Sequence, residues 1–197
     1  MVAKLLTVAL CFISTQALAA PTPLPIASPG SPAPSKPVHY CASLKTGIPS
    51  PMKGMHCGSG AIYLGSGPVS AGKSRPAELN LLLRNRLRSA QIAGKKHGYS
   101  IGITSGWRSL SEQQRIYRNA VKVYKNSANK WAMPPAKSMH PWGLAIDVHF
   151  NTQAAANWFK QNSATFGLCR MYKNEWWHFE PVIAPGGRCP KLRANAG

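Results

Sequence analysis

The first helical pattern of apolar residues along the chain lies between residues 76 and 93. Apolar residues three or four positions apart share one face of an α-helix, and here they are Leu79, Leu82, Leu83, Leu87 and Ala90. Pro76 suits the first turn of such a helix, and Gly94 and Gly98 are suited to end it. We expect the leucines to lie in the hydrophobic core.

A second helix is predicted from Ser109 to about Tyr124. Ser109 and Glu112 have the spacing of a capping box, in which two side chains bond free N–H groups at the helix start. The buried stripe of this helix is expected to consist of Ile116, Ala120, Val121 and Tyr124. Thr152 can cap a third, shorter helix that runs to about residue 164.

Alternation of apolar and polar residues predicts three strands, which are residues 99–104, residues 144–150 and a final strand containing residues 176–179. In the second of these, Asp147 and His149 share one face. Residues 125–139 and the tail from Pro185 are predicted to be irregular. Helices mixed with short strands, without a βαβ rhythm, indicate a small α+β domain whose short antiparallel sheet is flanked by helices.

The N-terminal part of the chain has the composition of an export signal followed by a linker. Residues 1–19 combine Lys4, an apolar stretch and an Ala-x-Ala cleavage sequence, which is typical of a signal peptide. Residues 20–38 are rich in Pro, Ala and Ser and are predicted to form an extended tether. We therefore expect a secreted or periplasmic protein without a transmembrane anchor.

Three further segments complete the predicted organisation of the chain. Residues 39–75 are expected to form a loop-rich extension, residues 76–190 the main domain and residues 191–197 a tail.

Cysteine usage fits export. Cys11 lies in the predicted signal peptide, and the four remaining cysteines allow three disulfide pairings. We favour Cys41–Cys57 and Cys169–Cys189, because each pair brackets one compact segment that contains Gly or Pro. A zinc site built from these thiols is the rival interpretation, and the lack of a Cys-x-x-Cys pair argues against it.

The charge balance is strongly basic, with 24 Lys and Arg against 5 Asp and Glu and a net charge of +19. Such a surface predicts an anionic partner, and export favours polymers of the cell envelope over nucleic acid. Three of the five acidic residues, Asp147, Glu175 and Glu180, lie in two short segments that also contain histidines. The alternative is that they only pair with surplus basic side chains, which usually stabilises little.

Those two segments predict a metal site. His140 enters from a loop restricted by Pro141, Gly143 permits a tight turn, and Asp147 follows on a strand. His178 in the second segment offers a third ligand. Two imidazoles and a carboxylate suit zinc and leave a fourth position for water, which is typical of a catalytic centre.

Other residues of the second segment complete the expected site. Glu175 is the candidate general base, and three aromatic residues, Trp176, Trp177 and Phe179, are expected to supply apolar walls. His149 is expected not to bind the metal, because three ligands already complete the pattern. Glu180 either orients a ligand or forms a surface ion pair.

Three ordered motifs resemble one known family. Ser-x-His-x-x-Gly-x-Ala-x-Asp over residues 138–147, followed by Glu-x-x-His over residues 175–178, is similar to the VanY-type D-alanyl-D-alanine carboxypeptidases, which are zinc peptidases. The stretch Ser-Gly-Trp-Arg-Ser over residues 105–109, with Gln113, Ile116 and Tyr117, resembles the same family. The resemblance spans roughly residues 78–182.

This resemblance implies roles for individual residues. It implies that His140, Asp147 and His178 bind zinc and that Glu175 is the catalytic base. It further implies that Arg108 stabilises the substrate or an oxyanion. Two polar residues, Gln113 and Ser138, are implied to position the substrate.

Three functions are compatible with these observations. The leading hypothesis is a monomeric zinc D,D-carboxypeptidase that removes the terminal D-Ala from peptidoglycan stem peptides. A lytic endopeptidase of the same group is the first alternative, favoured by the basic surface. A non-catalytic, zinc-containing module that binds the envelope or nucleic acid is the second, and the presence of Glu175 argues against it.

Overall fold

The computed structural model describes residues 39–43, 49–53, 55–65, 67–68, 75 and 77–196. The predicted signal peptide, the whole of the predicted tether and Pro76 lie outside these residues. Within the described part of the chain, no helix combines the length and the apolar character that crossing a membrane requires.

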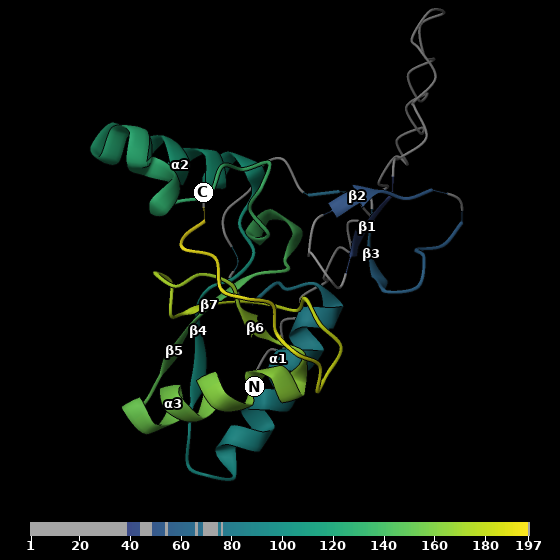
Figure 1. The fold of residues 1–197 in the computed structure, drawn as a ribbon, viewed down its shortest axis with the longest axis vertical. Coiled ribbons are helices and arrows are strands. Elements are labelled where there is room, and N and C mark those ends of the chain that lie inside the picture. Colours follow the sequence, from purple (N-terminus) through teal and green to yellow (C-terminus); the bar gives the residue numbers. More distant parts are fainter. Residues whose placement is uncertain are drawn as a thin grey trace, which may run out of the picture. The chain divides into compact units, whose positions relative to one another are not determined.

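A four-stranded antiparallel sheet carries the main domain (Figure 1). In spatial order its strands are β4 (Ile101–Ser105), β5 (Ile146–Phe150), β7 (His178–Glu180) and β6 (Cys169–Arg170). Asp147 on β5 pairs with Ser105 on one side and with His178 on the other. A register shift in β4 between Ile103 and Ser105 brings Ser105 opposite Asp147, and such irregularities are common beside active sites.

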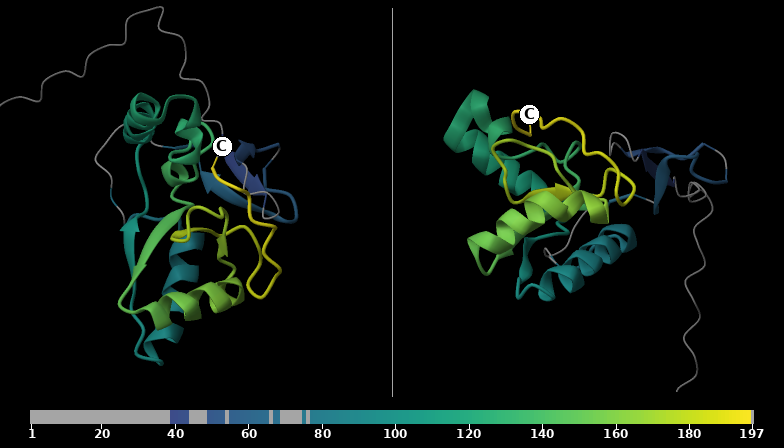
Figure 2. Two further views of the ribbon diagram at one scale, coloured as in Figure 1. Left: turned by 60° about the vertical axis from the view of Figure 1, so that its left-hand side comes forward. Right: turned by 60° about the horizontal axis from the view of Figure 1, so that its bottom comes forward.

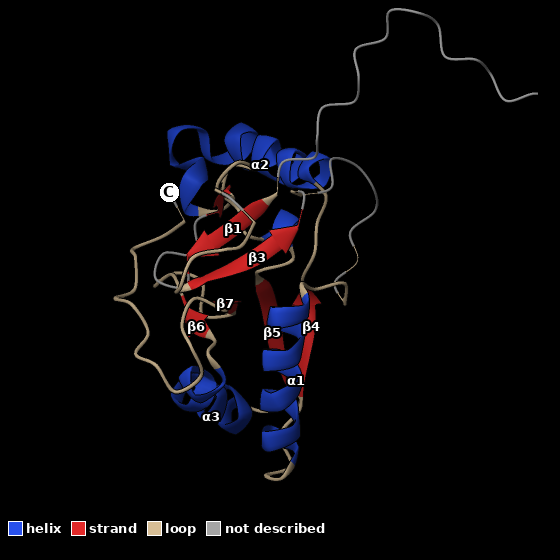
Figure 3. Ribbon diagram, turned by 90° about the vertical axis from the view of Figure 1, so that its right-hand side faces the viewer, coloured by secondary structure: helices blue, strands red, loops and turns tan. Residues whose placement is uncertain are grey.

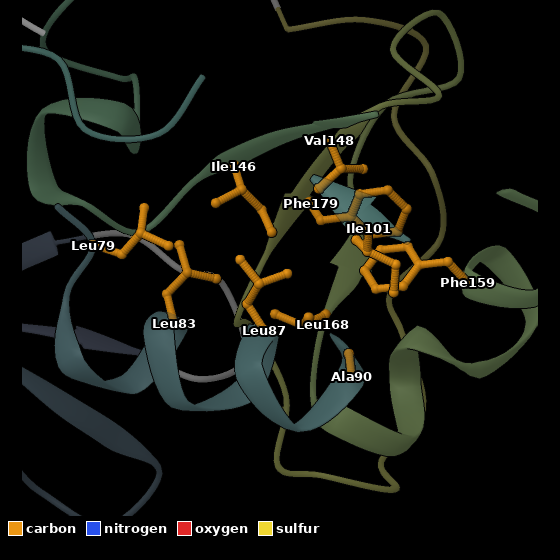
Figure 4. Packing of buried hydrophobic residues seen from close by; sticks show 10 residues of the cluster. All are labelled: Leu79, Leu83, Leu87, Ala90, Ile101, Ile146, Val148, Phe159, Leu168 and Phe179. Atoms are coloured by element: carbon orange, nitrogen blue, oxygen red, sulfur yellow. The ribbon is translucent and has the colours of Figure 1, made fainter. Parts of the chain in front are cut away.

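Helices α1 (Leu81–Lys95) and α3 (Gln153–Asn162) pack on one face of this sheet (Figure 3). Figure 4 shows the buried side chains between these helices and the sheet, which are Leu79, Leu83, Leu87, Ala90, Ile101, Ile146, Val148, Phe159, Leu168 and Phe179. The rings of Phe159 and Phe179 meet edge-on, with centroids 4.7 Å apart. Burial of each large side chain contributes about 1.5–3 kcal/mol, so this cluster is the main source of stability.

The first helix begins later than predicted. Leu79 is buried but not helical, and α1 starts at Leu81 because Asn80 caps it by accepting a hydrogen bond from the Leu82 N–H at 3.0 Å. The Asn80 N–H is used elsewhere, donating to the Gly143 carbonyl at 2.9 Å. Leu82 is only half-buried, whereas Arg86 of the same helix is buried and donates to the carbonyls of residues 167, 181 and 183.

Helix α2 (Leu110–Tyr124) starts as predicted, with the Ser109 hydroxyl accepting from the Glu112 N–H at 3.2 Å. Its predicted buried stripe is partly wrong, because Val121 and Tyr124 are 41% and 40% exposed. The helix lies at the end of the sheet towards which β4 points, not against a face of the sheet (Figures 1 and 3). Its contact with the domain is therefore narrow.

The region between α2 and β5 contains more helix than the sequence predicted. The 3-10 helix η1 (Lys125–Lys130) follows α2, and a second one, η2 (His140–Trp142), lies shortly before β5. After β5, the Thr152 hydroxyl caps α3 as predicted, accepting from the Ala155 N–H at 3.1 Å, and η3 (Ser163–Phe166) extends that helix.

The segment predicted to be loop-rich contains a second, three-stranded sheet. Its order is β2 (Pro49–Pro51), β1 (Tyr40–Ser43) and β3 (Ala61–Gly65). Both favoured disulfides are confirmed: Cys41–Cys57 closes this segment, and Cys169–Cys189 ties β6 to the C-terminal segment.

The residues after Cys189 pack against the domain. The Arg193 N–H donates to the Met171 carbonyl at 3.0 Å, and the Lys173 N–H donates to the Arg193 carbonyl at 2.9 Å. The Arg193 guanidinium also lies over the Tyr172 ring, 4.7 Å from its centroid. Figure 2 shows this segment returning towards α2, so Ala196 becomes buried in the cluster around Tyr172.

Candidate active site

The turn that contains His140 explains the His-x-x-Gly spacing. His140 opens η2, and its carbonyl accepts a hydrogen bond from the Gly143 N–H at 2.9 Å. Gly143 has φ +65°, and a Cβ atom there would lie 2.8 Å from the Asn80 backbone nitrogen. Glycine thus allows both the left-handed turn and the close approach of the start of α1.

The structure brings the three predicted metal ligands together. His140 Nε2 lies 3.5 Å from Asp147 Oδ1, and His178 Nδ1 lies 3.1 Å from the same oxygen. One ligand atom from each of the three side chains lies within 4.8 Å of the others. No other group of His, Cys, Asp or Glu with this geometry occurs among the residues that the structure describes.

The outer atoms of these side chains are held by other groups. His140 Nδ1 lies 2.6 Å from the Gly106 carbonyl oxygen, and His178 Nε2 lies 2.9 Å from Glu180 Oε1. Asp147 Oδ2 accepts a hydrogen bond from Arg108 at 2.7 Å. Such partners orient the ligands of metal sites and leave the inner atoms free to bind, so the donor set fits a metal ion.

The electrostatics also favour a cation between the three side chains. Burial alone would lower the pKa of His178, but its hydrogen bonds to Asp147 and Glu180 and their negative charges raise the pKa to about 10. Burial alone would raise the pKa of Asp147, yet the two imidazoles hold it well below its ordinary value. Burial and the charge of Arg108 lower the pKa of His140, which favours the neutral form that binds metals.

Glu175, the predicted general base, lies beside the three predicted ligands. Its Oε2 lies 3.8 Å from His178 Nδ1, beside the point where the ligand atoms meet. Burial raises its pKa, and although His178 opposes this rise, the charge of Asp147 adds to it. A raised pKa brings a carboxylate closer to the value that suits proton transfer near neutral pH.

Arg108 is held by three side chains of the site. It donates to Ser105 at 2.8 Å and to Gln113 at 3.1 Å, in addition to Asp147. Gln113 is 2% exposed, and its amide nitrogen donates to the Met133 carbonyl at 2.8 Å. The amide oxygen of Gln113 therefore holds Arg108 in position, while its amide nitrogen is held by the backbone.

The second polar residue implied to position substrate, Ser138, is also buried at the cleft. Its hydroxyl lies 3.4 Å from the His140 N–H, so it contacts the ligand turn. Both Gln113 and Ser138 line the cleft while bonding to protein groups.

These groups surround a cleft of about 160 Å³. Arg108 is the only Lys or Arg among the described residues that line it. The predicted apolar walls need correction: Trp177 lines the cleft, but Trp176 faces a different groove, and Phe179 points into the core on the opposite face of β7. The wall residues that the sequence did not reveal include Trp131, Met133, Tyr172 and Ala196.

His149 and the other acidic residues differ in whether they contact the predicted metal ligands. His149 shares a face of β5 with Asp147, but its ring packs over Gly102 and bonds Thr104 at 3.1 Å. Glu180 is 2% exposed and bonds His178, so it is not a surface ion pair. Only Glu78 and Glu112 form the exposed pairs expected of surplus charge, with Arg75 and Arg115.

Comparison with known proteins agrees with this geometry. The sequence model of the D-alanyl-D-alanine carboxypeptidase family, VanY, matches residues 78–181. This chain belongs to the VanY family. The matched range contains every predicted site residue, from Arg108 to His178.

Two curated relatives share the VanY-family part of the chain. A D-alanyl-D-alanine carboxypeptidase of Enterococcus faecalis (strain ATCC 700802 / V583) is 30% identical over 105 residues, covering 41% of this chain and 39% of the relative. The putative carboxypeptidase YodJ of Bacillus subtilis (strain 168) is 29% identical over 118 residues, covering 49% and 43%. This chain thus spans about two fifths of the length of these relatives.

A solved VanY-family structure shares the fold. VanYB in complex with D-alanine-D-alanine superposes with a TM-score of 0.50 at 25% identity, covering 58% of this chain and 77% of that one. The predicted α+β class and the recognised family are both confirmed.

Proposed function

We propose that this protein is an exported, zinc-dependent D,D-carboxypeptidase that hydrolyses the terminal D-Ala–D-Ala peptide bond of peptidoglycan stem peptides. One observation carries the proposal. Two imidazoles and a carboxylate converge with their outer atoms held by other groups, and a second carboxylate, Glu175, lies beside them. Family membership supports the reaction class.

We assign the metal to His140, Asp147 and His178. Two nitrogen donors and one oxygen donor are the ligand types of catalytic zinc sites, in which a fourth position stays open. When bound, zinc acts as a Lewis acid that polarises a carbonyl group and makes water more acidic. The four remaining cysteines pair in two disulfides, which leaves no thiol site among the described residues to compete for the metal.

Glu175 is assigned as the general base and acid. Its carboxylate takes a proton from the attacking water and returns it to the amine of the leaving D-Ala. The partial burial that raises its pKa makes both transfers easier near neutral pH.

We assign Arg108 the role of binding a negatively charged group of the substrate. It is the only permanent cation among the cleft-lining residues described, and its planar guanidinium suits a carboxylate or a developing oxyanion. Gln113 and Ser105 keep it in place. The complex of VanYB with D-alanine-D-alanine supports a dipeptide of this kind as the ligand of the family fold.

The proposal is tested by measuring D-Ala release from a pentapeptide that ends in D-Ala-D-Ala. We expect release by the zinc-loaded protein, loss of release after chelation and recovery when zinc is returned. Glu175→Gln should slow release about 10²–10⁴-fold, because a general base contributes that much, while zinc stays bound. Glu78→Gln is the matched control, since Glu78 forms a surface pair with Arg75.

Two results would overturn the proposal: release of D-Ala by metal-free protein, or an unchanged rate in Glu175→Gln. Mass analysis of digested peptidoglycan also decides between the proposed carboxypeptidase and an endopeptidase. Loss of single D-Ala residues supports the former, and cuts inside the stem or cross-bridge identify the latter.

A further inference from the structure

A second groove lies on the opposite side of β7 from the catalytic cleft. Side chains alternate between the two faces of a strand, so His178 and Glu180 line the cleft while Phe179 borders this groove. The groove has a volume of about 530 Å³ and lies between the start of α3, the end of β5 and Trp176.

An exposed indole forms one wall of this groove. Trp176 is 53% exposed, and its ring rests on Phe150, with centroids 6.4 Å apart and an angle of 32°. An exposed aromatic face beside a groove is typical of a binding surface. Phe150 behind the ring limits its movement, which makes Trp176 a firm platform for a flat apolar partner.

The opposite rim is polar and carries no acid. Gln153 and Asn157 lie one helical turn apart on α3, with their amides bonded at 3.1 Å. Lys160 on the same helix and Arg170 on β6 complete the rim. No Asp or Glu occurs among the described residues that line the groove, so a cationic ligand does not fit it.

We infer that this groove binds an oligosaccharide of N-acetylated amino sugars. A pyranose ring has an apolar C–H face, which packs on an indole, and an edge of hydroxyl and acetamido groups. The side-chain amides can donate to and accept from that edge, and the two cations can donate to its oxygens. The choice of a cell-wall glycan rests on the proposed function, because peptidoglycan stem peptides are attached to such a glycan.

The groove and the cleft meet at a single turn of the chain. Residues 175–178 form this turn, closed by a hydrogen bond of 3.4 Å from the His178 N–H to the Glu175 carbonyl. Trp176 faces the groove and Trp177 faces the cleft, with their rings edge-on at 5.5 Å. A glycan in the groove and its attached peptide in the cleft would therefore lie on either side of one turn.

Direct binding tests the inference without any catalytic step. The probe is the tetramer of N-acetylglucosamine, titrated into the zinc-loaded protein by calorimetry. We expect saturable binding and a rise in Kd of about ten-fold in Trp176→Ala, since loss of one aromatic contact and its buried area has that size. Tyr63→Ala is the matched control, because Tyr63 is also 53% exposed but lies on β3.

A second variant keeps the test valid if Trp176→Ala folds poorly. Lys160→Glu places an acid in the groove and should weaken binding, whereas Lys122→Glu on α2 should not. No binding to the unaltered protein at about 10 mM tetramer overturns the inference, as does equal binding by Trp176→Ala. Displacement of the tetramer by inorganic polyphosphate would instead identify an anion site and overturn the glycan assignment.

Competition separates this inference from the proposed function. At saturating tetramer, the apparent KM for a glycan-linked pentapeptide should rise at least about five-fold, while KM for the free pentapeptide stays unchanged. Inhibition of both substrates would place the sugar in the cleft and contradict the groove. If neither substrate releases D-Ala, the proposed function fails, and the binding titration still decides whether the groove holds sugar.

Discussion

The two faces of β7 differ in what they contain, although their residues are neighbours in the chain. On the cleft face, His178 and Glu180 are buried polar groups that bond each other, and His178 also bonds Asp147. On the other face, Phe179 packs against Phe159 in the apolar core. Strand alternation thus separates the groups proposed for chemistry from those that stabilise the fold.

Burying the polar side chains of the cleft face destabilises the fold, and their hydrogen bonds to one another offset this loss. Burying a polar group without a partner destabilises a protein by about 1–3 kcal/mol. Among the described residues, no buried side-chain nitrogen or oxygen lacks a hydrogen bond. The core face gains stability from burial alone, so the same strand should respond very differently to substitutions one residue apart.

The largest expected effect is that of His178→Ala on the cleft face. Loss of a ligand should remove zinc and lower D-Ala release at least about 10³-fold, because the metal contributes several kcal/mol of charge stabilisation. Zinc content and release rate are the measurements, and His97→Ala, in the exposed turn that follows α1, is the control. Near-normal release by His178→Ala would contradict the assignment.

Phe179→Ala tests the core face of the same strand. We expect the free energy of unfolding to fall by about 3–5 kcal/mol, because a fully buried phenylalanine leaves a cavity. Denaturant titration measures this change. Turnover per folded molecule should change far less than in His178→Ala, and equal losses of turnover in the two variants would remove the distinction between the faces.

Glu180→Gln should give a smaller effect confined to the cleft face. The Glu180 carboxylate holds the outer nitrogen of His178, and loss of such a partner lowers metal affinity about 10–100-fold. Zinc affinity measured against a competing chelator tests this, with Glu78→Gln as control. An unchanged affinity would mean that Glu180 does not position His178.

The smallest effect is expected for an acid that belongs to neither face. Glu112 bonds Arg115 on the surface of α2, and this bond lowers the pKa of Glu112. Glu112→Gln should lower the free energy of unfolding by about 0.2–1 kcal/mol. A folded-state pKa below the unfolded value gives stability that is complete above about pH 5 and fades on acidification below about pH 4. Denaturant titrations at pH 7 and pH 3 should show the difference shrinking at the lower pH, and a constant difference would contradict this cause.

Local patterns predicted much of the fold and the positions of the site residues. The cap at Ser109 and the alternation around Asp147 depend on residues close in sequence, and both are confirmed. The leucine spacing correctly predicted a helix here, although α1 begins only at Leu81 and Leu82 is only half-buried. The residues and the family resemblance together pointed to His140, Asp147 and His178 as one ligand set. The pairing of Asp147 on β5 with His178 on β7, which brings two of them together, is visible only in the structure.

Features that depend on tertiary packing were not predicted. Val121 and Tyr124 follow the helical period of α2 but are exposed, because only a narrow side of that helix meets the domain. The strands of the small sheet are only three to five residues long, and two of the three residues of β2 are Pro, so no alternation of apolar and polar residues could be recognised. Ala196 reaches the cleft only because the Cys169–Cys189 disulfide and Arg193 hold the C-terminal segment to the domain.

X-ray absorption at the zinc edge of the loaded protein tests the central claim most directly. The account predicts one zinc per chain, with nitrogen and oxygen neighbours at about 2.0–2.2 Å and the scattering pattern of two imidazoles, one of which disappears in His140→Ala. A sulfur neighbour at about 2.3 Å, or an unchanged spectrum in His140→Ala, would contradict a centre formed by His140, Asp147 and His178.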